Sequence, residues 1–160
     1  MRLFIPFIAS LFIALPAHAG DDLTARDGWS VTPTTKTFSA LVKDTRAAVK
    51  VNGMIVVTQA GPTAAAEKRG ITIPGNQVIG VFNNDYAVKI LDTSTAAMIE
   101  APIRMYVTEN DDGTATLSFK TPTTVFAPYA DEGGAALAAL SIQLDVLFTQ
   151  IAADAGKNMD

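Results

Sequence analysis

Residues 103–120 read IRMYVTENDDGTATLSFK and carry the clearest structural signal in the chain. Apolar side chains at Ile103, Met105 and Val107 alternate with polar ones, and the alternation resumes after the turn residues 110–113. Two alternating runs joined by Asn-Asp-Asp-Gly predict a β-hairpin that buries one face and leaves the other polar. We therefore expect an antiparallel arrangement with the core on one side.

The rest of the chain contains helices that can cover the core side of this hairpin. Apolar spacing predicts a helix from a cap at Thr37 to about Lys50 and a long helix from a cap at Asp131 to about Ala155. We also expect strands at 29–35, 54–58 (buried) and 78–82, helices at 63–69 and 86–91, and a helical turn at 95–100. This order predicts an α+β fold with a mixed or mostly antiparallel sheet, helices packed on one face and a long C-terminal helix.

Residues 1–19 contain the three parts of a secretory signal peptide. Arg2 precedes an apolar run over residues 3–15, and the small-residue end Ala17-His18-Ala19 follows Pro16. The run is shorter than the roughly 20 residues that a membrane span needs. We expect cleavage after Ala19, and neither a membrane anchor nor a later segment long and apolar enough to span a bilayer.

The mature chain, residues 20–160, is expected to fold as a single α+β domain in the periplasm or outside the cell. It contains no cysteine, and the one histidine of the sequence lies in the signal peptide. Catalysis or metal binding by thiolate or imidazole is thereby excluded. We expect no cofactor and no metal site, and a binding module rather than an enzyme, with carboxylate or lysine chemistry left open.

Charge makes nucleic acid an unsuitable partner. Without residues 1–19, 11 Lys and Arg stand against 16 Asp and Glu, a net charge of −5. The basic residues are scattered along the chain, whereas nucleic-acid binding requires clustered Lys and Arg. We expect no nucleic-acid partner.

Two segments carry a resemblance to a known family. Residues 101–107, APIRMYV, form a proline-led hairpin strand, and residues 117–122, LSFKTP, form a second strand closed by a proline. With the strand before them and the helix after them, they make residues 78–155 similar to the family called domain of unknown function 302. The resemblance implies a compact fold like that of TATA-box-binding-protein-type domains and a homodimer. It implies neither DNA binding nor an assigned reaction.

The first candidate site departs from that family's pattern. Many members carry Gly-Asn-Pro at the strand-to-helix junction, whereas this chain has Asn83, Asn84 and Asp85, of which only Asn84 matches. These residues either present free backbone N–H groups to an anionic ligand or cap the helix, and capping is their commoner use.

The second candidate site lies on the hairpin. Arg104, Tyr106 and Lys120 share its polar face, where Tyr106 offers a surface for stacking. A solvated sheet face explains the same pattern. The resemblance adds Tyr129 to the candidates: where many family members have a tyrosine before the proline, this chain has Phe119, and where a histidine often follows, it has Pro128-Tyr129.

Three functions stay open. The chain is either an exported binding or accessory module for a small ligand or partner, a structural or assembly protein, or an enzyme using carboxylate or lysine chemistry. A deep pocket containing Lys89, Arg104 or Glu100 would favour the first or the third, and a flat apolar patch the second.

The signal peptide gives the first testable prediction. The exported protein should begin at Gly20, because Ala17-His18-Ala19 fits the small-residue specificity of signal peptidase. Intact-mass spectrometry of the exported protein measures this. A soluble exported chain that keeps residues 1–19 would contradict it.

Overall fold

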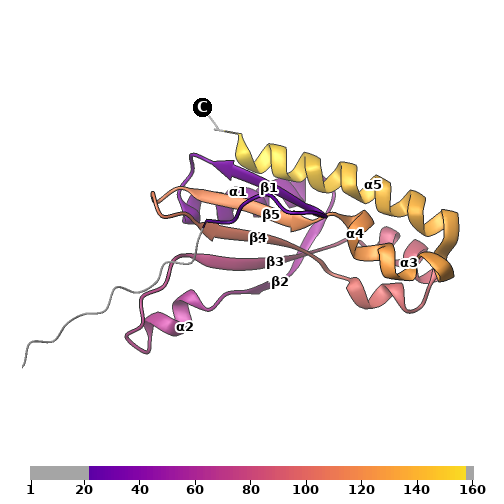
Figure 1. The fold of residues 1–160 in the computed structure, drawn as a ribbon, viewed down its shortest axis with the longest axis horizontal. Helices are drawn as coiled ribbons and strands as arrows, with labels where there is room; N and C mark the ends of the chain where they lie inside the picture. Colours follow the sequence, from indigo (N-terminus) through magenta and orange to yellow (C-terminus); the bar gives the residue numbers. More distant parts are fainter. Residues whose placement is uncertain (1–21, 158–160) are drawn as a thin grey trace, which may run out of the picture.

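The structure, a computed structural model, describes residues 22–157, so the predicted signal peptide lies outside the described residues (Figure 1). Five strands form one sheet in the order β1-β5-β4-β3-β2. They are β1 (Trp29–Thr34), β2 (Ile55–Ala60), β3 (Asn76–Phe82), β4 (Ile103–Glu109) and β5 (Ala115–Lys120). Every neighbouring pair is antiparallel, as the hairpin pattern favoured.

The principal helices gather on one face of this sheet (Figure 1). The helices are α1 (Phe38–Val51), α2 (Thr63–Glu67), α3 (Asn84–Thr93), α4 (Pro122–Phe126) and α5 (Ala130–Gly156), with 3-10 helices η1 (Ala97–Glu100) and η2 (Ala127–Tyr129). The expected α+β class is confirmed. The short helix α4 was not predicted, although Thr121 accepts the capping bond from the Thr124 amide and Pro122 suits its first turn.

The central hairpin has the predicted alternation. Met105 lies opposite Phe119 and Val107 opposite Leu117, and all four side chains are buried on the helix side. The alternate positions face the other side, which we call the open face, and Arg104 is among them. The period of two therefore fixes which side chains α1 and α5 cover and which remain available.

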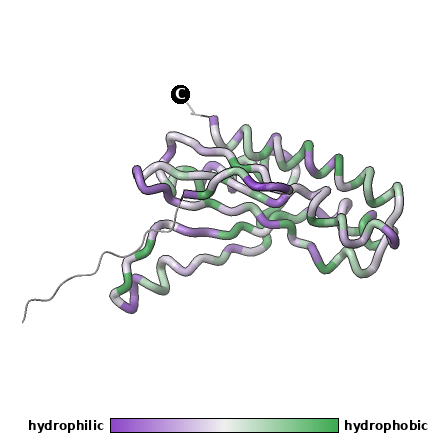
Figure 2. The backbone as a smooth tube through the Cα atoms, in the orientation of Figure 1, coloured by the Kyte–Doolittle hydropathy of each residue, from purple (hydrophilic) through white to green (hydrophobic). Residues whose placement is uncertain are grey.

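Helix α5 buries its predicted stripe against the sheet. The rings of Phe148 and Phe119 lie with centroids 5.6 Å apart, and Leu144 and Ile151 are buried beside them. Leu140 and Leu147, also assigned to the stripe, are only partly buried because they lie at its margin. Figure 2 shows hydrophobic residues recurring along the whole of α5.

The start of α5 differs from expectation. Asp131 does not cap the helix, because the chain enters α5 directly from η2 and Asp131 already lies in the first turn. Its negative charge still suits the helix N-terminus. Gly134, with φ 54° and ψ −149°, then interrupts the helical backbone, so the first turn is set at an angle to the rest.

The expectation that no later segment is long and apolar enough to span a bilayer was wrong. The 35-residue run Pro122–Gly156, which includes α5, meets both criteria by length and composition. Its outer side adds exposed Ile142 and Val146 to the buried stripe, which makes α5 apolar around most of its circumference. In this fold the buried side of α5 packs against the sheet as part of the hydrophobic core.

Strand β2 also differs from expectation. The run Met54 to Thr58 was interpreted as buried, but β2 is an edge strand, and Ile55 and Val57 are 55% and 45% exposed. Ile55 and Val57 flank Val56, which packs against the core, so alternation points both away from it, and the register shifts between Val56 and Thr58. A continuous apolar run does not distinguish a central strand from a bulged edge.

Residues 22–28, which we call the N-terminal strap, cross the open face before β1 begins (Figure 1). At one end the Asp22 carboxylate accepts a hydrogen bond from the Asp111 amide at 3.0 Å. At the other end Gly28, with φ 73°, reverses the chain, and its carbonyl accepts from the Thr121 amide at 2.9 Å. The open face is thus partly covered along β5, where Thr116 and Ser118 are buried.

The packing of α5 gives a stability prediction. Leu144→Ala should lower the free energy of unfolding by about 2–5 kcal/mol, because a buried leucine is replaced by a cavity. Gln143→Ala, on the exposed side, should change it by less than about 0.5 kcal/mol. Denaturant melts at several protein concentrations measure both values. An effect of Leu144→Ala confined to self-association would contradict the assignment of Leu144 to the core.

Candidate functional site

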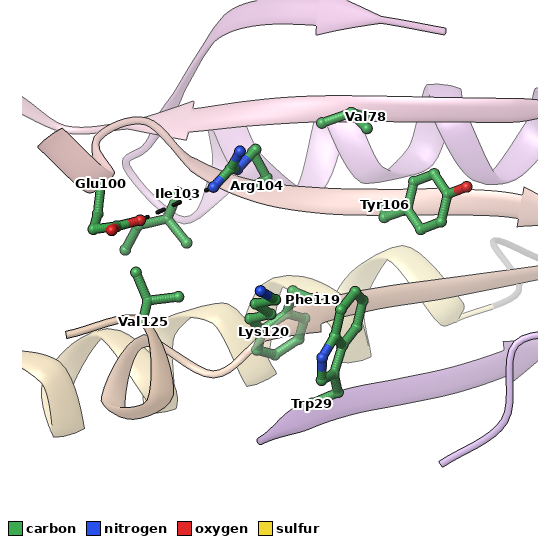
Figure 3. A pocket seen from close by; sticks show the side chains of 9 residues that line it. All are labelled: Trp29, Val78, Glu100, Ile103, Arg104, Tyr106, Phe119, Lys120 and Val125. Carbon is green, nitrogen blue, oxygen red and sulfur yellow. Dashed lines mark ion pairs between the residues drawn. The ribbon is translucent and has the colours of Figure 1, made fainter. Parts of the chain in front are cut away.

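A cleft of about 300 Å³ opens on the open face of the sheet, near the start of β4 (Figure 3). Its walls come from the four strands β1, β3, β4 and β5, the helical turn η1 before β4 and the helix α4 after β5. The lining residues are Trp29, Val78, Glu100, Ile103, Arg104, Tyr106, Phe119, Lys120 and Val125. Three of the predicted site residues, Arg104, Tyr106 and Lys120, therefore lie together in one cleft.

Cross-strand register brings these side chains together. Trp29 of β1 lies directly opposite Lys120 of β5, and Val78 of β3 lies opposite Tyr106 of β4. Directly opposed side chains in an antiparallel pair stand about 4.5–5.5 Å apart at Cβ and point to the same side. Because Arg104 and Tyr106 are two residues apart on β4, they also share this side.

The aromatic walls of the cleft are held by contacts of their own. The Lys120 ammonium lies 5.8 Å from the centre of the Trp29 ring, and the Arg26 guanidinium of the strap lies 5.4 Å from it. The Tyr106 hydroxyl accepts a short hydrogen bond from the Asn76 side-chain amide. These contacts orient two flat side chains before any ligand arrives.

The two cations of the cleft keep most of their bonding capacity. Arg104 makes one ion pair, with Glu100, at the long distance of 4.0 Å, and its side chain is 65% exposed. Lys120 makes no ion pair within residues 22–157. A guanidinium offers five N–H donors and an ammonium three, so this end of the cleft can receive an anion.

Tyr129 reaches the cleft through Glu100 rather than by lining it. Its hydroxyl donates to Glu100 Oε1 at 2.8 Å, while Glu100 Oε2 faces Arg104. The hydrogen bond to Glu100 raises the pKa of Tyr129, with burial and the negative charges of Glu100 and Glu132 acting in the same direction. Tyr129 is therefore a neutral donor that holds the Glu100 carboxylate at the edge of the cleft.

The junction residues have a different role. The Asn83 side chain accepts hydrogen bonds from the amides of Asp85 and Tyr86 at 2.9 and 3.3 Å, which makes it the cap of α3. Its own amide donates to the Gly53 carbonyl at 3.0 Å. Asn84 and Asp85 occupy the exposed first turn, and none of the three lines the cleft. Of the two alternatives for these residues, an anion site or a helix cap, this geometry matches the helix cap.

Sequence reasoning missed Trp29, Val78 and Val125 as lining residues. Trp29, the one tryptophan, stands on a strand of β-forming residues, but only the pairing of β1 with β5 places it beside Lys120.

The contact between Tyr129 and Glu100 gives a testable prediction. Tyr129 should ionise above the pH typical of tyrosine, and Glu100→Gln should lower its pKa, because the variant removes the negative charge that opposes tyrosinate. An NMR titration with isotope-labelled tyrosine measures the midpoint, and Tyr129→Phe assigns the signal. An unchanged midpoint in Glu100→Gln would contradict the contact.

Comparisons with known proteins agree with this fold. A crystal structure of an uncharacterized conserved protein DUF302 from Bacillus stearothermophilus superposes with a TM-score of 0.72 at 15% sequence identity, covering 82% of this chain and 100% of that one. No curated protein matches the chain. The model of the family described as domain of unknown function DUF302 matches residues 30–151. Apart from Trp29, the first residue of β1, the match spans the sheet, the cleft-lining hairpin and most of α5, and the chain therefore belongs to the DUF302 family.

Proposed function

We propose that this protein is a binding module for small organic anions that carry a flat apolar group. The observation that carries the proposal is the meeting of Arg104 and Lys120 with the rings of Trp29 and Tyr106 in one cleft of about 300 Å³. A volume of this size is at the lower end of the range of small-molecule sites.

Different side chains of the cleft suit the charged part and the flat part of such a ligand. Arg104 and Lys120 bear the charge, and their N–H groups suit a carboxylate, which forms charge-assisted hydrogen bonds with either side chain. Trp29 and Tyr106 provide flat surfaces for stacking, which contributes beyond the burial of apolar area. Val78 and Val125 add apolar walls.

The cleft favours this function over its alternatives. It contains Arg104 and Glu100, and a pocket with such residues favours a ligand site over a flat apolar interface. The Glu100 carboxylate accepts a hydrogen bond from Tyr129 and faces Arg104, so it serves to orient these side chains at the edge of the cleft. We propose that binding takes place in the periplasm or outside the cell, after removal of residues 1–19.

N-acetylphenylalanine is the probe for this function, since it joins one carboxylate to one aromatic ring. Binding should change the fluorescence of Trp29, the one tryptophan of the chain, because Trp29 lines the cleft. N-acetylphenylalanine amide, which has the ring without the charge, should bind at least about tenfold more weakly, since charge-assisted hydrogen bonds are the stronger kind.

Variants test whether the preference for the carboxylate over the amide arises in the cleft. Arg104→Gln and Lys120→Gln should each weaken binding of the carboxylate and leave binding of the amide unchanged. Lys43→Gln, an exposed position on α1, is the matched control. Equal affinities for the carboxylate and the amide, or losses in Lys43→Gln as large as in Arg104→Gln, would overturn the proposed function.

A further inference from the structure

The N-terminal strap ends in a turn that holds Trp29 at the wall of the cleft. The Trp29 amide donates to the Arg26 carbonyl at 3.2 Å, and between these two residues the chain reverses at Gly28, whose φ is 73°. The same turn brings the Arg26 guanidinium to 5.4 Å from the centre of the Trp29 ring. Arg26 therefore contacts Trp29 twice, through its backbone and through its side chain.

This turn is also fastened to the chain after β5. The Gly28 carbonyl accepts from the Thr121 amide at 2.9 Å and from the Thr121 hydroxyl at 3.3 Å. Gly28 packs so closely that an added Cβ would stand 2.6 Å from Thr124 Oγ1. Thr121 directly follows Lys120, and Thr124 directly precedes Val125, and both neighbours line the cleft. The turn and two lining residues thus belong to one set of contacts.

The Arg26 side chain acts on the cleft only through Trp29. Arg26 does not line the cleft itself, and its guanidinium forms no ion pair among residues 22–157. Lys120 also lies near the Trp29 ring, but it comes from β5 and does not belong to the turn that holds the Trp29 backbone. A cation over an aromatic ring attracts the ring and restricts where it can lie.

The rest of the strap is fastened more loosely than its turn. Residues 24–27 are exposed, and at the far end the Asp22 carboxylate accepts from the Asp111 amide at 3.0 Å. Segments with few buried contacts open locally at a low cost in free energy. A ligand that stacks on Trp29 favours the state in which the strap is docked, and by thermodynamic linkage a docked strap favours the ligand equally.

We propose that docking of the N-terminal strap and ligand binding in the cleft stabilise one another, with Arg26 as the positioning residue that holds the Trp29 ring. This inference rests on the proposed function, because it requires a ligand that stacks on Trp29. It assigns a role in binding to a segment of which no residue lines the cleft.

The first test is Arg26→Gln, with the two probes used above. N-acetylphenylalanine and its amide should both bind about twofold to fivefold more weakly, the factor expected for a cation over an exposed ring. The two losses should be equal, because Arg26 acts on stacking, whereas Arg104→Gln should weaken the carboxylate alone. A loss confined to the carboxylate would mean that Arg26 binds the charge, and would overturn the positioning role.

The unliganded protein offers a second readout of the same variant. Trp29 is the one tryptophan of the chain, so its near-ultraviolet circular dichroism reports how firmly this ring is held. The tryptophan band should weaken in Arg26→Gln and stay the same in the control Lys43→Gln. An unchanged band in Arg26→Gln would also overturn the positioning role.

Two glycines provide a matched pair for the turn. Gly28 and Gly53 both have φ 73°, so alanine brings the same backbone strain at either position. Only at Gly28 does the new Cβ meet Thr124, whereas nothing lies within 4 Å of a Cβ at Gly53. Gly28→Ala should weaken both probes at least as much as Arg26→Gln, and Gly53→Ala should leave both affinities unchanged. Equal affinities in the two glycine variants would contradict the coupling.

Hydrogen exchange tests the reciprocal effect, away from the cleft. Saturating N-acetylphenylalanine should slow exchange of the Asp111 amide, which donates to Asp22 of the strap, by at least about twofold. The Thr114 amide donates to Asp112 in the same hairpin turn and is the control. Unchanged exchange at Asp111 with binding intact would overturn the coupling while the anion cleft stands. If neither probe binds the unaltered protein, both proposals fail.

Discussion

The contact between Phe148 of α5 and Phe119 of β5 is the interaction on which the rest of the architecture depends. It joins the longest helix to the sheet, and Leu144 and Ile151 extend the buried surface in both directions along α5. Because α1 and α5 occupy the same face, every second residue of β4 and β5 is committed to the core. The remaining residues have no helix above them, and only the N-terminal strap covers part of them, so their identity determines what the open face can bind.

That open face has two properties that a merely solvated sheet would lack. Its cations and aromatic rings meet in one cleft, since β1 and β3 bring Trp29 and Val78 to either side of the hairpin. The N-terminal strap also lies across it, and Ser118 is fully buried there. The surface is therefore shaped by segments far apart in the chain, which positions polar groups more firmly than isolated surface side chains.

The parts of the structure that follow from local pattern were predictable from sequence, and the parts that follow from pairing were not. Alternation in residues 103–120 gave the hairpin and placed Arg104, Tyr106 and Lys120 on one face. The exposure of β2 was missed because a bulge and an edge position leave no signal in an apolar run. Trp29 entered the site only through the pairing of β1 with β5, and ligand binding by the residues of the cleft stays a prediction.

We propose that this protein binds small anions on the open face of the sheet rather than on the helix side. The most direct measurement is a map of backbone amide chemical shifts during titration with N-acetylphenylalanine. The perturbed residues should cluster around the cleft, at Trp29, Arg104, Tyr106 and Lys120. Perturbations confined to α3 and α5, or none at concentrations well above those expected for a small-ligand site, would contradict it.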